Sequence, residues 1–181
     1  MSQAIIDQVT TLNHAFDARV QAASADSWGN QSPCAEWKAR DVVVHVANNL
    51  SGIGAGLGGA EGHEVCADED IVAAWNRSRD SFLGVLPTAD LSTSLPGPFG
   101  PMPAEQLIGR LISTDVLVHT WDLARSVGGD EALDAESVVQ AYSGLKPMDA
   151  MIRSGTAFGP KIEVTDAGLQ TEFLSFLGRA V

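Results

Sequence analysis

Five residues of one predicted helix form a narrow stripe whose second half is polar: Ile108, Ile112, Asp115, His119 and Asp122. At about 100° per residue the stripe spans about 80°, so all five side chains share one side of the helix. The apolar residues mark that side as the one that faces the interior. A carboxylate there must be paired, hydrogen-bonded or bound to a metal ion. The stripe therefore predicts a polar site inside the protein.

Asp115 and His119 are four residues apart, so their side chains project from consecutive turns of the helix. This spacing lets two ligands from one helix reach the same ion, as in zinc enzymes with paired helical ligands. His45, within DVVVHVANNL on another predicted helix, is the candidate for a third ligand. Three neighbours at helical spacing could orient its ring: Asp41, Asn48 and Asn49. The alternative is a site without metal, in which these groups hydrogen-bond in a polar patch of the core.

Other reactive and aromatic residues have simpler interpretations. Cys34 and Cys66 share no short metal-ligand spacing and are expected to be free thiols, of which Cys34 could be reactive. Arg110 and Arg125 could bind an anionic substrate, but both fit solvated helix positions. Three tryptophans are expected in the core: Trp37, Trp75 and Trp121. Two histidines are not expected at the site: His14 and His63.

Hydrophobic periodicity predicts five helices, at about residues 3–24, 41–53, 69–86, 103–127 and 135–145. A glycine-rich loop follows the second helix, and the proline-rich segment 95–103 must be extended or turning. Two short elements are expected in the tail, at 161–165 and 169–179. The predicted fold is all-α: four long helices form a bundle, with a short extended segment and a small C-terminal tail. The prediction is one domain, residues 1–181.

Composition disfavours two classes of partner. The chain carries 11 basic and 23 acidic side chains, for a formal net charge of −12. Nucleic acids and anionic membranes are bound mainly through Lys and Arg, so neither is expected here. No stretch approaches the roughly 20 consecutive apolar residues that span a bilayer. The N-terminus lacks a basic region followed by an apolar block, so no signal peptide is predicted and a cytoplasmic location is expected.

Four blocks of the sequence, in this order, resemble a known family: SPCAEWKARDVVVHVANNL, GPFGPMPAEQL, DVLVHTWDLARSVGG and FGPKIEVT…LSFLGR. They resemble the metal-binding branch of the DinB-like superfamily that is related to the N-terminal domain of mycothiol-dependent maleylpyruvate isomerase. The resemblance implies a DinB-like four-helix bundle that binds a divalent metal, with zinc favoured and nickel or iron as alternatives. It places the metal ligands at His45, Asp115 and His119. The isomerase relatives carry Glu where this chain has Asp115, one methylene shorter.

The resemblance also implies a chemistry. Two imidazoles and one carboxylate leave a coordination position open, at which a water or thiol can be activated. Relatives use such a site with low-molecular-weight thiols, such as mycothiol or bacillithiol. The expected function is thiol transfer to, or isomerisation of, a small electrophile, although maleylpyruvate isomerase activity itself is not expected because only about 30 residues follow the bundle. The alternative is a non-enzymatic metal-binding or stress-response protein.

Relatives in this superfamily are often dimers. A homodimer is compatible with the sequence, although no exposed apolar stripe requires one.

Overall fold

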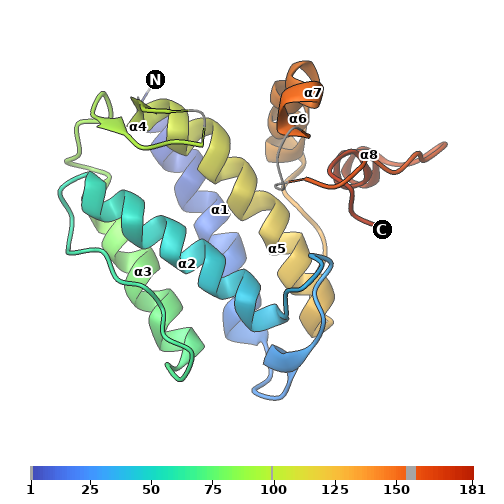
Figure 1. Ribbon diagram of the computed structural model, residues 1–181, viewed down its shortest axis with the longest axis horizontal. Coiled ribbons are helices and arrows are strands. Elements are labelled where there is room, and N and C mark those ends of the chain that lie inside the picture. The colour runs from blue at the N-terminus through green and yellow to red at the C-terminus, as the bar shows by residue number, and fades with distance from the viewer. Residues whose placement is uncertain (1, 99, 154–157) are drawn as a thin grey trace.

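Four long helices form the body of the protein (Figure 1). The structure is a computed structural model that describes residues 2–98, 100–153 and 158–181. The four helices are α1 (Ser2–Ala22), α2 (Ala39–Gly56), α3 (Ile71–Val85) and α5 (Ser113–Val127). Helix α2 packs against α3 and α5, and α1 packs against α5 and α3, which closes the bundle. The predicted all-α bundle is therefore confirmed.

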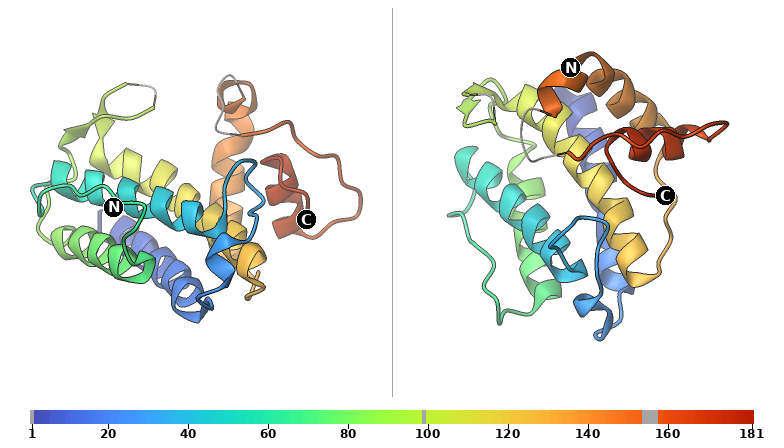
Figure 2. Two further views of the ribbon diagram at one scale, coloured as in Figure 1. Left: turned by 60° about the horizontal axis from the view of Figure 1, so that its bottom comes forward. Right: turned by 45° about the vertical axis from the view of Figure 1, so that its right-hand side comes forward.

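The shorter elements lie at both ends and along one side of this bundle (Figure 1). They are the helical segments η1 (Ser27–Gly29), α4 (Ala104–Gln106), η2 (Leu107–Ile112), α6 (Ala135–Leu145), η3 (Lys146–Met148), α7 (Asp149–Ile152) and α8 (Leu169–Phe176), and the strands β1 (Ser94–Leu95) and β2 (Met102–Pro103). Helix α6 packs on α5 and α8 packs on α6. The C-terminal helices thus cover the side of α5 that faces away from α2 and α3 (Figure 2).

The core is built from the apolar stripes of the four helices. On α1 these residues are fully or almost fully buried: Val9, Leu12, Phe16 and Val20. The ring of Phe16 lies 4.7 Å from that of Trp75 on α3, between centroids, and the Trp75 indole donates a hydrogen bond to Asp17. Trp75 and Trp121 have no exposed surface, so their predicted place in the core is confirmed. No helix in the described residues is both long and apolar enough to cross a bilayer.

The helix predicted for residues 103–127 is interrupted near its start. Residues Leu107–Ile112 form a π-helical segment, in which Ser113 Oγ also donates to the carbonyl of Ile108. The wider turn shifts the phase of Ile108 and Ile112 relative to α5, so the five-residue stripe is not a straight line of regular helix. Its polar half lies entirely in α5, which is regular up to its C-cap at Gly128 (φ +70°).

Of the two predictions for segments outside the long helices, the one for 161–165 is wrong and the one for 95–103 is confirmed. The expected element at 161–165 does not form: Ile162 and Val164 are 40% and 39% exposed and have no partner strand. The segment 95–103 contributes to a short antiparallel hairpin of β1 and β2, in which Leu95 pairs with Met102. This hairpin closes the end of the bundle beside α2.

The close packing of α2 on α3 depends on Gly54. A Cβ atom at this position would lie 3.3 Å from the Phe82 Cα atom, whereas one at Gly52 would meet nothing within 4 Å. We expect Gly54→Leu to lower the free energy of unfolding by about 1–3 kcal/mol, because the added side chain forces the helices apart. Urea denaturation measures the change. Gly52→Leu is the matched control and should cost less than about 0.5 kcal/mol, and equal losses in the two variants would contradict this account.

Candidate metal centre

The three side chains predicted as ligands lie together, where α2 crosses α5. Nε2 of His45 is 3.1 Å from Oδ1 of Asp115, and Nε2 of His119 is 3.4 Å from the same oxygen. Packing of α2 against α5 brings His45 next to Asp115 and His119, which follow it in the sequence by 70 and 74 positions. The shorter side chain of Asp115 reaches both imidazoles without help from any other residue.

This donor set fits a divalent ion. Ligands of a tetrahedral zinc ion lie about 2.0–2.2 Å from it and therefore about 3.4 Å from one another. The two measured separations, 3.1 and 3.4 Å, match this spacing, and all three ligand atoms lie within 4.8 Å of one another. The His119 side chain is only 8% exposed, whereas those of His45 and Asp115 are 31% and 26% exposed. A further ligand would therefore approach from the side of His45 and Asp115.

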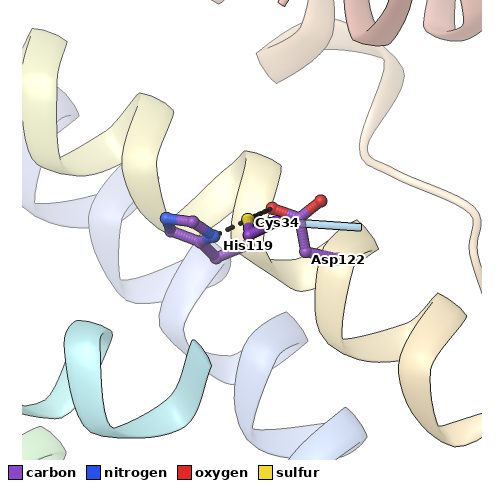
Figure 3. A group of neighbouring side chains, drawn as sticks. All are labelled: Cys34, His119 and Asp122. Carbon is purple, nitrogen blue, oxygen red and sulfur yellow. Dashed lines mark hydrogen bonds and ion pairs between the residues drawn. The ribbon is translucent and has the colours of Figure 1, made fainter. Parts of the chain in front are cut away.

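Asp122 fixes the orientation of His119. Its Oδ2 atom lies 2.9 Å from Nδ1 of His119, and its side chain has no exposed surface (Figure 3). The imidazole donates its Nδ1 proton to Asp122, so Nε2 is the nitrogen that faces Asp115. A carboxylate in this place is the usual partner of a metal-binding histidine.

Arg179, from the segment after α8, is the part of this site that sequence reasoning missed. Its Nη2 and Nε atoms lie 2.9 and 3.3 Å from the two oxygens of Asp122, and the residue is only 8% exposed. Gly178 adopts φ +82°, which turns the chain after α8 so that the side chain of Arg179 reaches α5. The sequence offered one indication of such a residue: Asp122 was predicted to face the interior, and a buried aspartate requires a nearby cation.

A second cluster of potential ligands consists of Cys34, His119 and Asp122. Cys34 Sγ donates to Asp122 Oδ2 at 3.3 Å (Figure 3), but Nη2 of Arg179 lies 3.5 Å from the same sulfur. The guanidinium would repel a metal cation bound here. The cluster that contains His45 is therefore the better candidate for a cation site. Both cysteines are free thiols, as predicted.

Trp37 is not a core residue as predicted but covers the site. It is half-buried in the loop before α2, with its ring centroid 4.9 Å from that of His45 and 5.6 Å from that of His119. Asn49 lies on another side, with Nδ2 3.1 Å from His45 Nε2 and 3.3 Å from Asp115 Oδ2. Asp41, in contrast, accepts a hydrogen bond from the Lys38 backbone at the start of α2 and does not contact His45.

The remaining candidates lie outside the site. His14 is exposed on α1, and His63 forms an ion pair with Glu69 in the loop before α3. Arg125 pairs with Glu131, and Arg110 is exposed, so neither arginine reaches the three ligands.

Electrostatics hold the site in a charged state. Burial by itself raises the pKa of Asp115, but the charge of His119 and hydrogen bonds from both imidazoles hold the pKa well below its usual range. Burial lowers the pKa of His119, yet the neighbouring carboxylates raise it well above its ordinary value. A metal ion must therefore displace a proton from His119, and its affinity should fall as the pH falls.

A cavity of about 630 Å³ opens beside Asp115. It lies between α2, the β1–β2 hairpin and the π-helical segment η2. Asp115 belongs both to the lining and to the ligand cluster, and Asn49, which also lines the cavity, donates to Asp115. A molecule in the cavity would therefore be in contact with the candidate metal centre.

Comparison with known proteins finds one family match and two relatives. Residues 9–124 match the family model of the mycothiol maleylpyruvate isomerase N-terminal domain. Two Mycobacterium tuberculosis proteins, Uncharacterized protein MT0763 (strain CDC 1551 / Oshkosh) and Uncharacterized protein Rv0738 (strain ATCC 25618 / H37Rv), are each 30% identical over 136 residues, 74% of this chain and 73% of theirs. No solved structure matches the chain. The family match includes the three candidate ligands and Asp122 but ends before Arg179.

Arg179→Met should destabilise the protein, because it removes the guanidinium that pairs with the buried charge of Asp122 and leaves His119 as the remaining partner. Loss of one partner of a buried ion pair costs about 3 kcal/mol or more, which urea denaturation of the metal-free protein can measure. Combining it with Asp122→Asn removes the uncompensated charge, so the double variant should be more stable than Arg179→Met alone. A double variant that is less stable would show that Arg179 acts mainly through other contacts.

Proposed function

Because the chain belongs to the mycothiol maleylpyruvate isomerase N-terminal domain family, we propose that His45, Asp115 and His119 bind a divalent metal ion for thiol chemistry. In this proposal the protein transfers a low-molecular-weight thiol of the mycothiol or bacillithiol type to a small electrophile, or isomerises the electrophile with its help. The observation that carries the proposal is the convergence of three ligand atoms, at spacings that fit one ion, beside a cavity.

Two imidazoles and a carboxylate favour zinc, with nickel or iron as alternatives. When bound, such an ion supplies a Lewis acid that lowers the pKa of a coordinated thiol. The surrounding residues have supporting roles. Asp122 keeps the Nδ1 proton of His119 in place, Arg179 holds Asp122, and Trp37 shields both imidazoles from water on one side.

The position beside His45 and Asp115 remains accessible. The side chains of His45 and Asp115 are 31% and 26% exposed, and Asp115 lines the cavity. A thiol that approaches there would meet an electrophile held in the cavity. An ion enclosed on every side could only be structural, so this accessibility supports an enzyme over a non-enzymatic metal-binding or stress-response protein.

Elemental analysis of untagged protein tests the metal site. We expect about one equivalent of zinc, nickel or iron in the wild type, and its loss in His45→Ala and in His119→Ala, since each change removes one of three ligands. His63→Ala is the matched control, because this histidine is paired with Glu69 away from the site, and it should retain the metal. Less than a tenth of an equivalent in the wild type after metal loading would end the proposal.

Cobalt-substituted protein tests for thiol binding. Mycothiol should produce a new sulfur-to-cobalt absorption band in the near ultraviolet, because the thiol enters the accessible position as a thiolate. The S-methyl derivative of mycothiol, which cannot form a thiolate, is the control and should give no band. A protein that retains its metal but gives no band with either mycothiol or bacillithiol would favour the non-enzymatic alternative.

A further inference from the structure

The cavity beside the candidate metal centre has an apolar base. Leu95, Leu107 and Ile112 line it and are each 5–6% exposed. Its α2 wall is open because two glycines, Gly52 and Gly56, take the place of side chains. A Cβ atom at Gly56 would lie 2.8 Å from Leu95 Cδ2, whereas one at Gly52 would meet nothing within 4 Å. The two glycines therefore leave room for the cavity between α2 and the hairpin.

The charge of the lining is the second observation. Within the described part of the chain, Asp115 is the one ionisable residue that lines the cavity, and no lysine, arginine or histidine does so. The chain as a whole has a net charge of −12. A carboxylate or phosphate on a ligand would therefore have no cationic side chain to pair with, and Asp115 would repel it. In the proposed function, Asp115 and the thiolate together offset the two charges of the metal ion.

Two polar side chains of the lining, Asn48 and Asn49, have hydrogen-bonding capacity left for an uncharged group. Asn48 uses Oδ1 to accept a hydrogen bond from the Val65 backbone, and Asn49 uses Nδ2 toward His45 and Asp115. Among the described residues, Asn48 Nδ2 and Asn49 Oδ1 have no hydrogen-bond partner. Together they offer donors and an acceptor, which complement a carbonyl or carboxamide but do not neutralise an anion.

We propose that this cavity binds an uncharged ligand with an apolar body and a carbonyl or carboxamide group, and that it excludes dicarboxylates and phosphorylated compounds. The inference rests on the proposed function in so far as this ligand is the electrophile of that reaction. Apolar walls bury the body of the ligand, while the two asparagines bind its polar end. Discrimination against anions follows from their unpaired charge beside Asp115.

Benzamide and benzoate test the inference, because they have the same size and shape and differ in charge. The probes are titrated into the ¹⁵N-labelled full-length chain after treatment with a chelator, so that no metal ion can hold the carboxylate. We expect benzamide to shift the amide signals of Gly52, Gly56 and Leu95 with saturation. Benzoate should bind at least tenfold more weakly.

Gly52→Leu fills the cavity from α2 and should weaken benzamide binding at least tenfold. Gly84→Leu is its matched control, since a Cβ there, on α3, also meets nothing within 4 Å and lies away from the cavity. Spectral dispersion establishes that both variants are folded. Benzoate binding as tight as that of benzamide, no saturable shift with either probe, or wild-type affinity in Gly52→Leu would each overturn the inference.

The result is separable from the proposed function, because neither metal nor thiol takes part in the titration. Selective benzamide binding by a protein that takes up no metal would support the cavity's preference while the metal-dependent reaction fails. Metal and thiol binding without selectivity for benzamide would support the proposed function and overturn the inference about the cavity.

Discussion

The buried carboxylate of Asp122 determines how the candidate site is assembled. It has no exposed surface, and a charge in such a place is stable only when it is paired and hydrogen-bonded. Arg179, His119 and Cys34 all direct donors at it. Through these contacts one charge connects α5 with the loop before α2 and with the C-terminal segment, and it also determines which nitrogen of His119 faces Asp115.

The rest of the site follows from how α2 and α5 pack. Their crossing brings His45 to Asp115 and His119, and Trp37 covers the two imidazoles from the loop that leads into α2. The hairpin and the π-helical segment then leave a cavity on the side where His45 and Asp115 are accessible. One side of the site is thus closed by an aromatic ring and a buried ion pair, and the other is open to small molecules. This asymmetry suits a site at which a reactant must enter and leave.

Much of this arrangement could be predicted from local spacing. The stripe of Val9, Leu12, Phe16 and Val20 identified α1, and the four-residue separation of Asp115 and His119 placed both on one side of α5. These are interactions along one helix, for which the period of the helix is sufficient information. The proximity of His45 came from family resemblance, because periodicity says nothing about which helices meet.

What could not be predicted depends on contacts between distant segments. Arg179 pairs with Asp122 across 57 residues, and its position requires the turn at Gly178. Trp37 appeared to be a core residue because composition does not show that its neighbours would be imidazoles. The π-helical turn at Leu107–Ile112 was not predicted because the helical spacing of apolar residues continues through it. Alternating apolar residues at 162 and 164 form no strand without a partner.

The position of Arg179 means that the part of the chain that matches the family is shorter than the part that builds the candidate site. The family match ends at residue 124, yet the cation that neutralises Asp122 is found 55 residues later. A fragment trimmed to residues 9–124 would keep His45, Asp115 and His119. It would lose the guanidinium of Arg179, which pairs with Asp122, the residue that orients His119. A chain that kept Asp122 but lacked Arg179 would leave this buried carboxylate without its guanidinium partner.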